Sequence, residues 1–276
     1  MKQKLLLLCL LLSPIVFYAQ KLNKAKNNLK KDSSYKVSYD KIEIEDNQSD
    51  KTSSFQHDLA YELIAKPILF ITSYVGYGLL VETVMEKEGK HAYMELTPYP
   101  YINHLKGDYA FEANEVTFTR FDISNQFLTD QNNTYGNNLN VKFRFLKRAS
   151  VEYNQLYLLE TQKYTSQFFT HDLTANYYRV RTQHLSLHYG LGVSYAYSGV
   201  NKAYFTYNTG ISYFMNVPLS ISLEHRGTPF SVNGIYQTKL NFNYHINNYV
   251  IQAGFNFYNI GNVHYKMFSL GGKIYL

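Results

Sequence analysis

Cysteine is nearly absent from this sequence: its 276 residues include only one, Cys9. Cys9 lies in an apolar run near the N-terminus and is followed by three leucines, without the small residues that surround the acylated cysteine of a lipoprotein. Once that run is removed, the chain has no thiol. This excludes disulfide bonds, thiolate metal sites and cysteine nucleophiles from the mature protein.

Long hydrophobic runs are also missing, and the run near the N-terminus is too short to cross a bilayer. Lys2 and Lys4 precede an apolar stretch over Leu5–Leu12, and a second short run ends at Ala19. This pattern predicts a cleaved secretory signal peptide over residues 1–19. We therefore expect an exported protein.

Charged residues are scarce, at 17%, and tryptophan is absent, whereas the chain has 28 tyrosines and 18 phenylalanines. The mean hydropathy is nevertheless −0.32, which is too polar for a helical membrane protein. Antiparallel membrane strands explain both values, because one face carries apolar and aromatic side chains and the other carries polar ones. The formal net charge of +6 is a mild excess and does not indicate nucleic-acid binding.

Alternation of apolar and polar residues is clearest over His184–Tyr197, where Leu185, Leu187 and Tyr189 begin the apolar face. A strand of about 14 residues is longer than most strands of soluble proteins and is long enough for a tilted membrane crossing. Gly136-Asn137-Asn138 is typical of a turn. The same alternation predicts ten further strands: Tyr93–Ile102, Tyr109–Phe127, Val141–Phe145, Ser150–Glu160, Phe168–Arg181, Ala203–Met215, Leu219–Arg226, Lys239–Ile246, Tyr249–Tyr258 and Ser269–Leu276.

The candidates number eleven from residue 92 on, and a strand near 69–81 would be the twelfth. Because bacterial single-chain barrels use even numbers of strands, we expect an all-β, transmembrane, antiparallel up-and-down β-barrel of about 12 strands, with ten as the alternative. The barrel domain would span residues 58–276 and begin with a short helix, after a flexible periplasmic segment over 20–57. An in-plane helix at the membrane surface is the alternative for 69–81.

The last eight residues alternate in the same way, with Ser269 and Gly271 on one face and Ile274 and Leu276 on the other. These four residues resemble the C-terminal signal that marks outer-membrane barrels for assembly. The chain thereby resembles small, functionally uncharacterised outer-membrane β-barrels of Gram-negative bacteria. The resemblance implies delivery by periplasmic chaperones, insertion by the barrel-assembly machinery, location in the cell outer membrane and contact with its lipids.

With the apolar faces outward, the opposite faces would line a predominantly basic lumen. Such charges either pair with one another in a plugged barrel or line a water-filled pore that favours anions and passes small solutes. The expected function is non-enzymatic: a narrow, porin-like channel or a structural or surface protein. The residues expected to line the lumen are Lys142, Arg144, Glu152, Arg179, Arg181, Glu224, Arg226, Lys239 and His245.

A lipid-modifying hydrolase of the outer membrane is the alternative function. Ser186 lies between His184 and His188 on one face of a strand, and residues two apart on a strand have Cβ atoms roughly 6–7 Å apart, within reach of a hydrogen bond. No third residue is evident to orient the histidine, and no lipase motif surrounds the pair. The sequence shows no phosphate-binding loop and no metal-ligand spacing, so we expect no cofactor and no metal.

Overall fold

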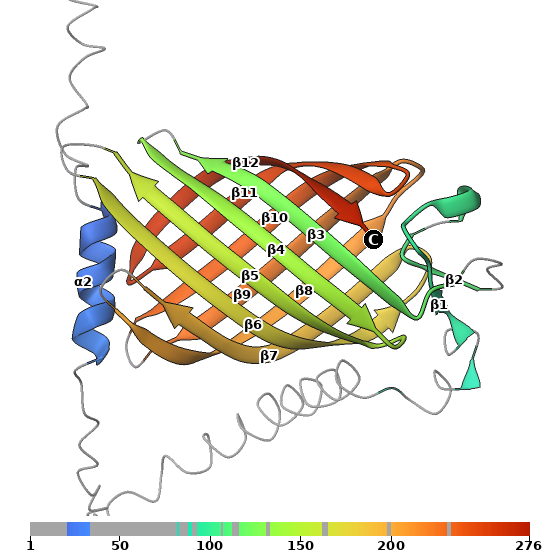
Figure 1. Cartoon of the computed structure of the whole chain (residues 1–276), viewed down its shortest axis with the longest axis horizontal. Helices are drawn as coiled ribbons and strands as arrows, with labels where there is room; N and C mark the ends of the chain where they lie inside the picture. The colour runs from blue at the N-terminus through green and yellow to red at the C-terminus, as the bar shows by residue number, and fades with distance from the viewer. Residues whose placement is uncertain are drawn as a thin grey trace, which may run out of the picture. The chain divides into compact units, whose positions relative to one another are not determined.

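Figure 1 shows the computed structural model of the chain. The chain divides into two compact units, Met1–Tyr35 with Tyr93–Leu276, and Lys36–Ala92. The predicted signal peptide, the leading helix of the 58–276 domain and the candidate strand at 69–81 lie outside the described residues. The structure describes residues 21–33, 82, 88–89, 93–105, 107–111, 116–130, 133–161, 165–197, 200–230 and 233–276.

Ten antiparallel strands form a closed barrel in which each strand pairs with its neighbours in sequence. The last strand pairs with the first, from Phe268 opposite Thr129 to Tyr275 opposite Asp122. The β-barrel is therefore confirmed, with the alternative count of ten rather than twelve. Its strands are β3 (Thr119–Thr129), β4 (Thr134–Phe145), β5 (Ala149–Glu160), β6 (Ser166–Arg181), β7 (Leu185–Ala196), β8 (Lys202–Phe214), β9 (Leu219–Pro229), β10 (Gly234–Ile246), β11 (Tyr249–Ile260) and β12 (Val263–Tyr275).

The expected strand at Tyr93–Ile102 does not form. This segment holds only β1 (Glu95–Leu96) and the start of a 3-10 helix, η3 (Ile102–His104), and β1 pairs with β2 (Tyr109–Ala110). Two prolines and the left-handed backbone of Tyr101, at φ 68°, prevent an extended run. The expected long strand from residue 109 likewise starts only at β3. We call the described residues 93–105 and 107–111 the plug.

The outward-facing side chains form an apolar exterior. In the middle of their strands Leu191 is 59% exposed, Phe255 is 50% exposed and Leu270 is 53% exposed. The rings of Phe121 and Phe143 stack on neighbouring strands with centroids 4.5 Å apart. An apolar surface repeated on every strand would drive association in water, so it needs an apolar environment.

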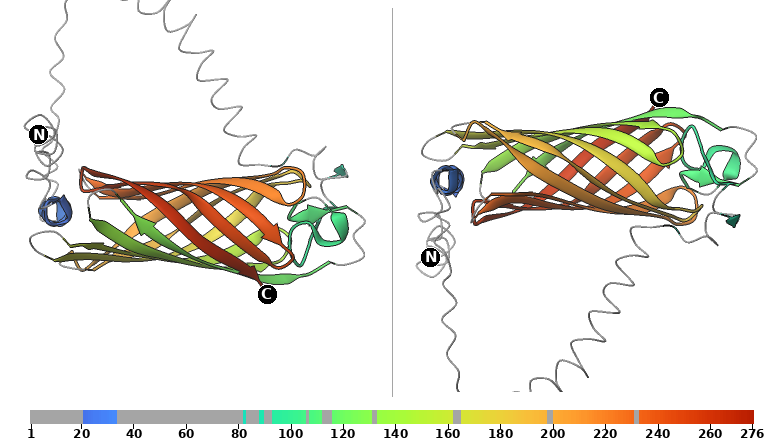
Figure 2. Two further views of the ribbon diagram at one scale, coloured as in Figure 1. Left: turned by 90° about the horizontal axis from the view of Figure 1, so that it is seen from above. Right: turned by 90° about the horizontal axis from the view of Figure 1, so that it is seen from below.

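Helix α2 (Lys21–Ser33) lies across the end of the barrel opposite the C-terminus, as Figures 1 and 2 show. Leu22, Ala25 and Leu29 share one helical face and are fully buried in an apolar cluster with residues of the strand ends. The Leu22 amide donates to Glu160 Oε2 at 2.8 Å. The expectation of a flexible segment over 20–57 is therefore wrong for residues 21–33, because these three apolar residues anchor the helix.

We refer to the two ends of the barrel as the α2 end and the plug end. The plug lies beside the C-terminus. Phe121 of β3 pairs with Leu276, and the preceding residue, Arg120, donates to Thr97 O of the plug at 2.9 Å. No helix among the described residues is long and apolar enough to cross a membrane.

Candidate functional site

The lumen is lined by polar and charged side chains that alternate with the apolar exterior. Among the residues expected there, Glu224 is half-buried, and the other eight are buried with at most 8% exposure. Arg179 lies at a β-bulge, where the β6–β7 register shifts between Tyr178 and Val180. The bulge keeps Tyr178 and Arg181, three positions apart, both buried.

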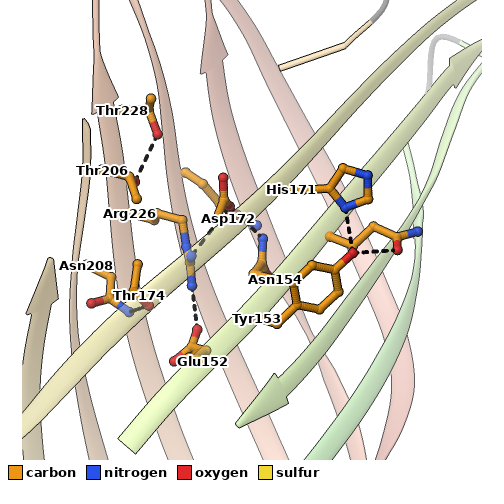
Figure 3. Close-up of polar contacts among 12 residues, drawn as sticks. Glu152, Tyr153, Asn154, His171, Asp172, Thr174, Thr206, Asn208, Arg226 and Thr228 are labelled. Carbon is orange, nitrogen blue, oxygen red and sulfur yellow. Dashed lines mark hydrogen bonds and ion pairs between the residues drawn. The ribbon is translucent and has the colours of Figure 1, made fainter. Parts of the chain in front are cut away.

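Glu152 is the centre of an ionic network in the middle of the lumen, part of which Figure 3 shows. Its carboxylate lies 3.1 Å from Lys142 Nζ and pairs with Arg226, which reaches it from strand β9. It also accepts hydrogen bonds from Asn140 at 2.7 Å and Asn176 at 3.1 Å. Four donors from three strands, β4, β6 and β9, thus converge on one carboxylate that is 1% exposed.

The same network crosses the lumen at two further points. Arg226 also approaches Asp172 of β6, with 3.4 Å between Nη1 and Oδ2, and Asn154 of β5 donates to the same oxygen at 3.0 Å. Lys239 of β10 donates to Asn138 of β4 at 2.6 Å. In the circular strand order β4 and β10 are separated by three strands on one side and by five on the other. These contacts tie opposite walls of the barrel together.

A second ionic cluster fastens the plug to the barrel wall; we call it the clasp. It consists of Asp108 from the plug, Arg120 and Asp122 from β3, and Arg144 from β4. Asp108 lies 3.0 Å from Arg120 and 2.9 Å from Arg144, and Asp122 lies 2.6 Å and 3.4 Å from the same two arginines. Burial alone would raise the pKa of Asp108, but Arg144 and Arg120 outweigh it and hold that pKa below its ordinary value.

Other contacts also join the plug to the barrel. Arg181 donates to Met94 O at 3.3 Å, and Glu95 forms a partly exposed ion pair with Lys147. The Tyr101 hydroxyl donates to Leu219 O at 2.5 Å, at the β8–β9 turn. Burial, with a contribution from Asp108, raises the pKa of Tyr101 to about 12, so this hydroxyl stays a donor at neutral pH.

Two cavities between the lumen side chains are small. One of about 10 Å³ borders Glu152, His188 and Arg226, and another of about 20 Å³ borders Asp122, Lys142 and Lys273. Volumes of this size hold about one water molecule each. The lumen is therefore closely packed around Glu152 and around Lys142.

The serine and histidines predicted for hydrolysis are not brought together. Ser186 and His188 are both buried, and no hydrogen bond joins Ser186 to either histidine in the described structure. His184 Nδ1 instead lies 3.0 Å from Phe214 O.

A different serine–histidine contact forms on the plug side of the lumen, where Ser220 Oγ lies 2.8 Å from His245 Nε2. The His245 ring packs edge-on against Tyr101 of the plug, with centroids 5.1 Å apart. His245 Nδ1 is buried and has no partner in the described part of the chain, so the carboxylate of a catalytic triad is missing there. Within the same residues, no group of three or more potential ligands is placed to hold a metal ion.

Sequence reasoning missed four charged residues of the lumen: Arg120 and Asp122, which share an inward face with Gln126; Asp172, which shares one with Thr174; and Asp108. The period-two rule identifies the three on strands once the strand bounds are known. Asp108 carries no such signal because it belongs to the plug. The expectation of a predominantly basic lumen left out these three aspartates, which all pair with arginines.

Comparisons with known proteins show similarity to outer-membrane β-barrels in fold. The Yersinia pestis outer membrane protein Ail in a phospholipid nanodisc aligns with 14% identity and a TM-score of 0.33, over 57% of this chain and 99% of that chain. The N-terminal barrel domain of Pseudomonas aeruginosa OprF gives 12% and 0.29, over 57% and 97%. Neisserial surface protein A gives 13% and 0.27, over 56% and 94%.

No protein-family model matches the sequence, and no curated protein matches it. The barrel fold of this chain therefore rests on its own strand pairing, from β3 round to β12.

Proposed function

We propose that this chain is an integral outer-membrane β-barrel that is closed at rest and serves as a non-enzymatic structural or surface protein. The observation that carries the proposal is the contrast between an apolar exterior and an interior whose charges pair across the lumen. Hydrocarbon is the environment that favours the exterior, since burying a side chain such as Leu191 is worth about 1.5–3 kcal/mol. Because the strands close into a barrel, most of the wall has no sheet edge whose backbone N–H and C=O groups would be left unpaired in lipid.

A closed lumen is favoured over an open, anion-selective pore for a specific reason. Lys142 and Arg226 both pair with Glu152, and the clasp holds the plug across one end. Cations that are paired in this way offer little attraction to a passing anion, and the two cavities beside them have room for about one water molecule each. A narrow channel would require the plug and the network around Glu152 to rearrange.

Reconstitution into planar lipid bilayers tests the closed lumen. We expect no steady conductance from the wild-type chain at moderate voltage, because no water-filled path crosses the network. Bilayers treated with the same detergent without protein serve as the control. Steady, anion-preferring current steps that depend on the protein would contradict the closed state and support the channel.

The absence of enzymatic activity is a separate part of the proposal. Ser220 is 2% exposed and Ser186 is 2% exposed, so neither hydroxyl is open to a lipid. We expect the purified protein to release no fatty acid from phospholipid or lipopolysaccharide. Turnover that disappears in Ser220→Ala or in Ser186→Ala, with the barrel still folded, would identify a hydrolase.

A further inference from the structure

One of the places where a ladder of the barrel wall ends before its strand does is the seam between β3 and β12. The β3–β12 ladder stops at Thr129 opposite Phe268, although β12 begins five residues earlier, at Val263. Those five residues pair only with β11 among the described residues. In this part of β12, at the α2 end, the described strand pairing is with β11 alone and not with β3.

The backbone of this part of β12 is directed alternately toward β11 and toward the seam. Leu276 exchanges both of its backbone hydrogen bonds with Phe121 of β3, and the pairing runs from there without a register shift. The even-numbered residues of β12 therefore direct their N–H and C=O groups toward β3. His264 and Lys266 are the next members of that series beyond the end of the described ladder.

A cavity of about 620 Å³ lies at this seam. Phe255, Phe257 and Phe268 provide an aromatic side, and all three are about half-exposed on the outer face of the barrel. The volume falls in the range of pockets that bind small organic ligands. This cavity is far larger than the two lumen cavities beside Glu152 and Lys142, and it opens on the surface that we assign to lipid.

The end of the cavity toward α2 is basic. His264 and Lys266 are exposed there, and Lys21 of α2 also borders it. The one carboxylate on the lining is Asp130, which already accepts the Thr134 amide at 2.9 Å. The lining thus has three basic residues and one carboxylate that already accepts a hydrogen bond, a balance that favours binding of an anion.

Tyr265 also borders the cavity, although its side chain is on the inward face of β12. Tyr265 is 2% exposed, and its hydroxyl has no hydrogen-bond partner among the described residues. Its side chain belongs to the buried apolar cluster with Leu22 and Leu29 of α2, so the side chains that β12 presents to the outer face come from the alternate positions, such as His264 and Lys266.

We propose that this seam pocket binds a phosphate-bearing membrane lipid. Lys266, His264 and Lys21 take the phosphate, and an acyl chain runs along Phe255, Phe257 and Phe268 toward the middle of the barrel wall. The order of the two ends matches the order in a bilayer, because the cations lie at the strand ends and the aromatic rings lie nearer the middle of the wall. The inference rests on the proposed membrane location, and it adds a specific lipid site to that location.

Lipid binding to the detergent-solubilised full barrel, counted by native mass spectrometry, tests the proposal. Dioleoyl phosphatidylglycerol and dioleoyl phosphatidylcholine are titrated separately. We expect one phosphatidylglycerol to bind at least about tenfold more tightly, because charge-assisted bonds to the phosphate are available to a headgroup without its own cation. The double variant H264Q/K266Q should lose that preference, while K202Q, an exposed lysine at the same end on β8, should keep it.

Three results would overturn the proposal: equal affinity for the two lipids, a preference that survives in H264Q/K266Q, or inorganic phosphate competing as strongly as the lipid. The last would show that the aromatic side plays no part. A chain that is folded and soluble without detergent would instead refute the membrane location itself. The failure of the lipid site and the failure of the proposed function are thus distinguishable.

Discussion

Replacing Glu152 with alanine should lower the free energy of unfolding by about 3–5 kcal/mol. The carboxylate is 1% exposed and takes donors from Lys142, Arg226, Asn140 and Asn176. Its removal leaves two buried cations without their principal partner, which costs far more than the loss of one favourable contact. Urea titration in lipid vesicles, followed by the electrophoretic mobility shift between folded and unfolded barrel, measures the change.

The matched control for Glu152→Ala is Glu95→Ala. Glu95 also forms an ion pair, with Lys147, but both side chains are partly exposed, at 26% and 41%. Solvent screens this pair, so its loss should cost about 0–1 kcal/mol. Equal small effects of the two substitutions would mean that the lumen around Glu152 is hydrated and open.

Replacing Leu191 with arginine should destabilise the barrel by about 2–4 kcal/mol in lipid. Leu191 lies in the middle of β7, faces outward and is 59% exposed. In a water-soluble barrel this exposed position would accept arginine with little cost. In a membrane the guanidinium would have to enter hydrocarbon, so the size of the destabilisation shows whether lipid or water surrounds the wall.

Tyr249→Arg is the control for depth. Tyr249 is also outward and exposed, at 58%, but it begins β11 next to a turn. Near the bilayer surface the same charge should cost about 0–1 kcal/mol. A neutral effect at both positions would place the wall in water, and a large effect at both would mean a loss of packing unrelated to depth.

Much of the barrel wall could be predicted from the sequence, because period-two alternation is a local property. The face of β7 that carries Ser186 and His188 is inward, as the alternation requires, and Ser269 and Tyr275 of β12 are inward as well. The pairing of β12 with β3 also follows from the need to close the sheet. None of these inferences needs knowledge of distant contacts.

The expected turn at Gly136-Asn137-Asn138 shows where local chemistry is overruled. These residues lie inside β4, because β3 and β5 continue on both sides of them. A Cβ on Gly136 would lie 2.7 Å from the Leu158 side chain and 2.7 Å from Tyr157 O. The glycine therefore serves close strand packing at this point, which its sequence neighbours do not reveal.

The plug, the clasp and α2 could not be placed from sequence, since their positions depend on contacts with distant strands. Asp108 meets Arg120 and Arg144 across long separations in the chain. Leu22 and Leu29 form a helical face whose burial depends on the barrel end beneath it. The Ser220–His245 contact was missed for the same reason, because it joins β9 and β10 rather than neighbours on one strand.

Spin labels placed one at a time on residues 185–196 of β7 test the central claim most directly. Replacing Cys9 by serine gives a background without other thiols. In reconstituted vesicles, oxygen accessibility should alternate with period two, high at Leu187, Leu191 and Val193 and low at Ser186 and His188, with a maximum at Leu191. High accessibility of the outward positions to a water-soluble nickel reagent, or no alternation, would contradict a barrel whose apolar wall faces lipid.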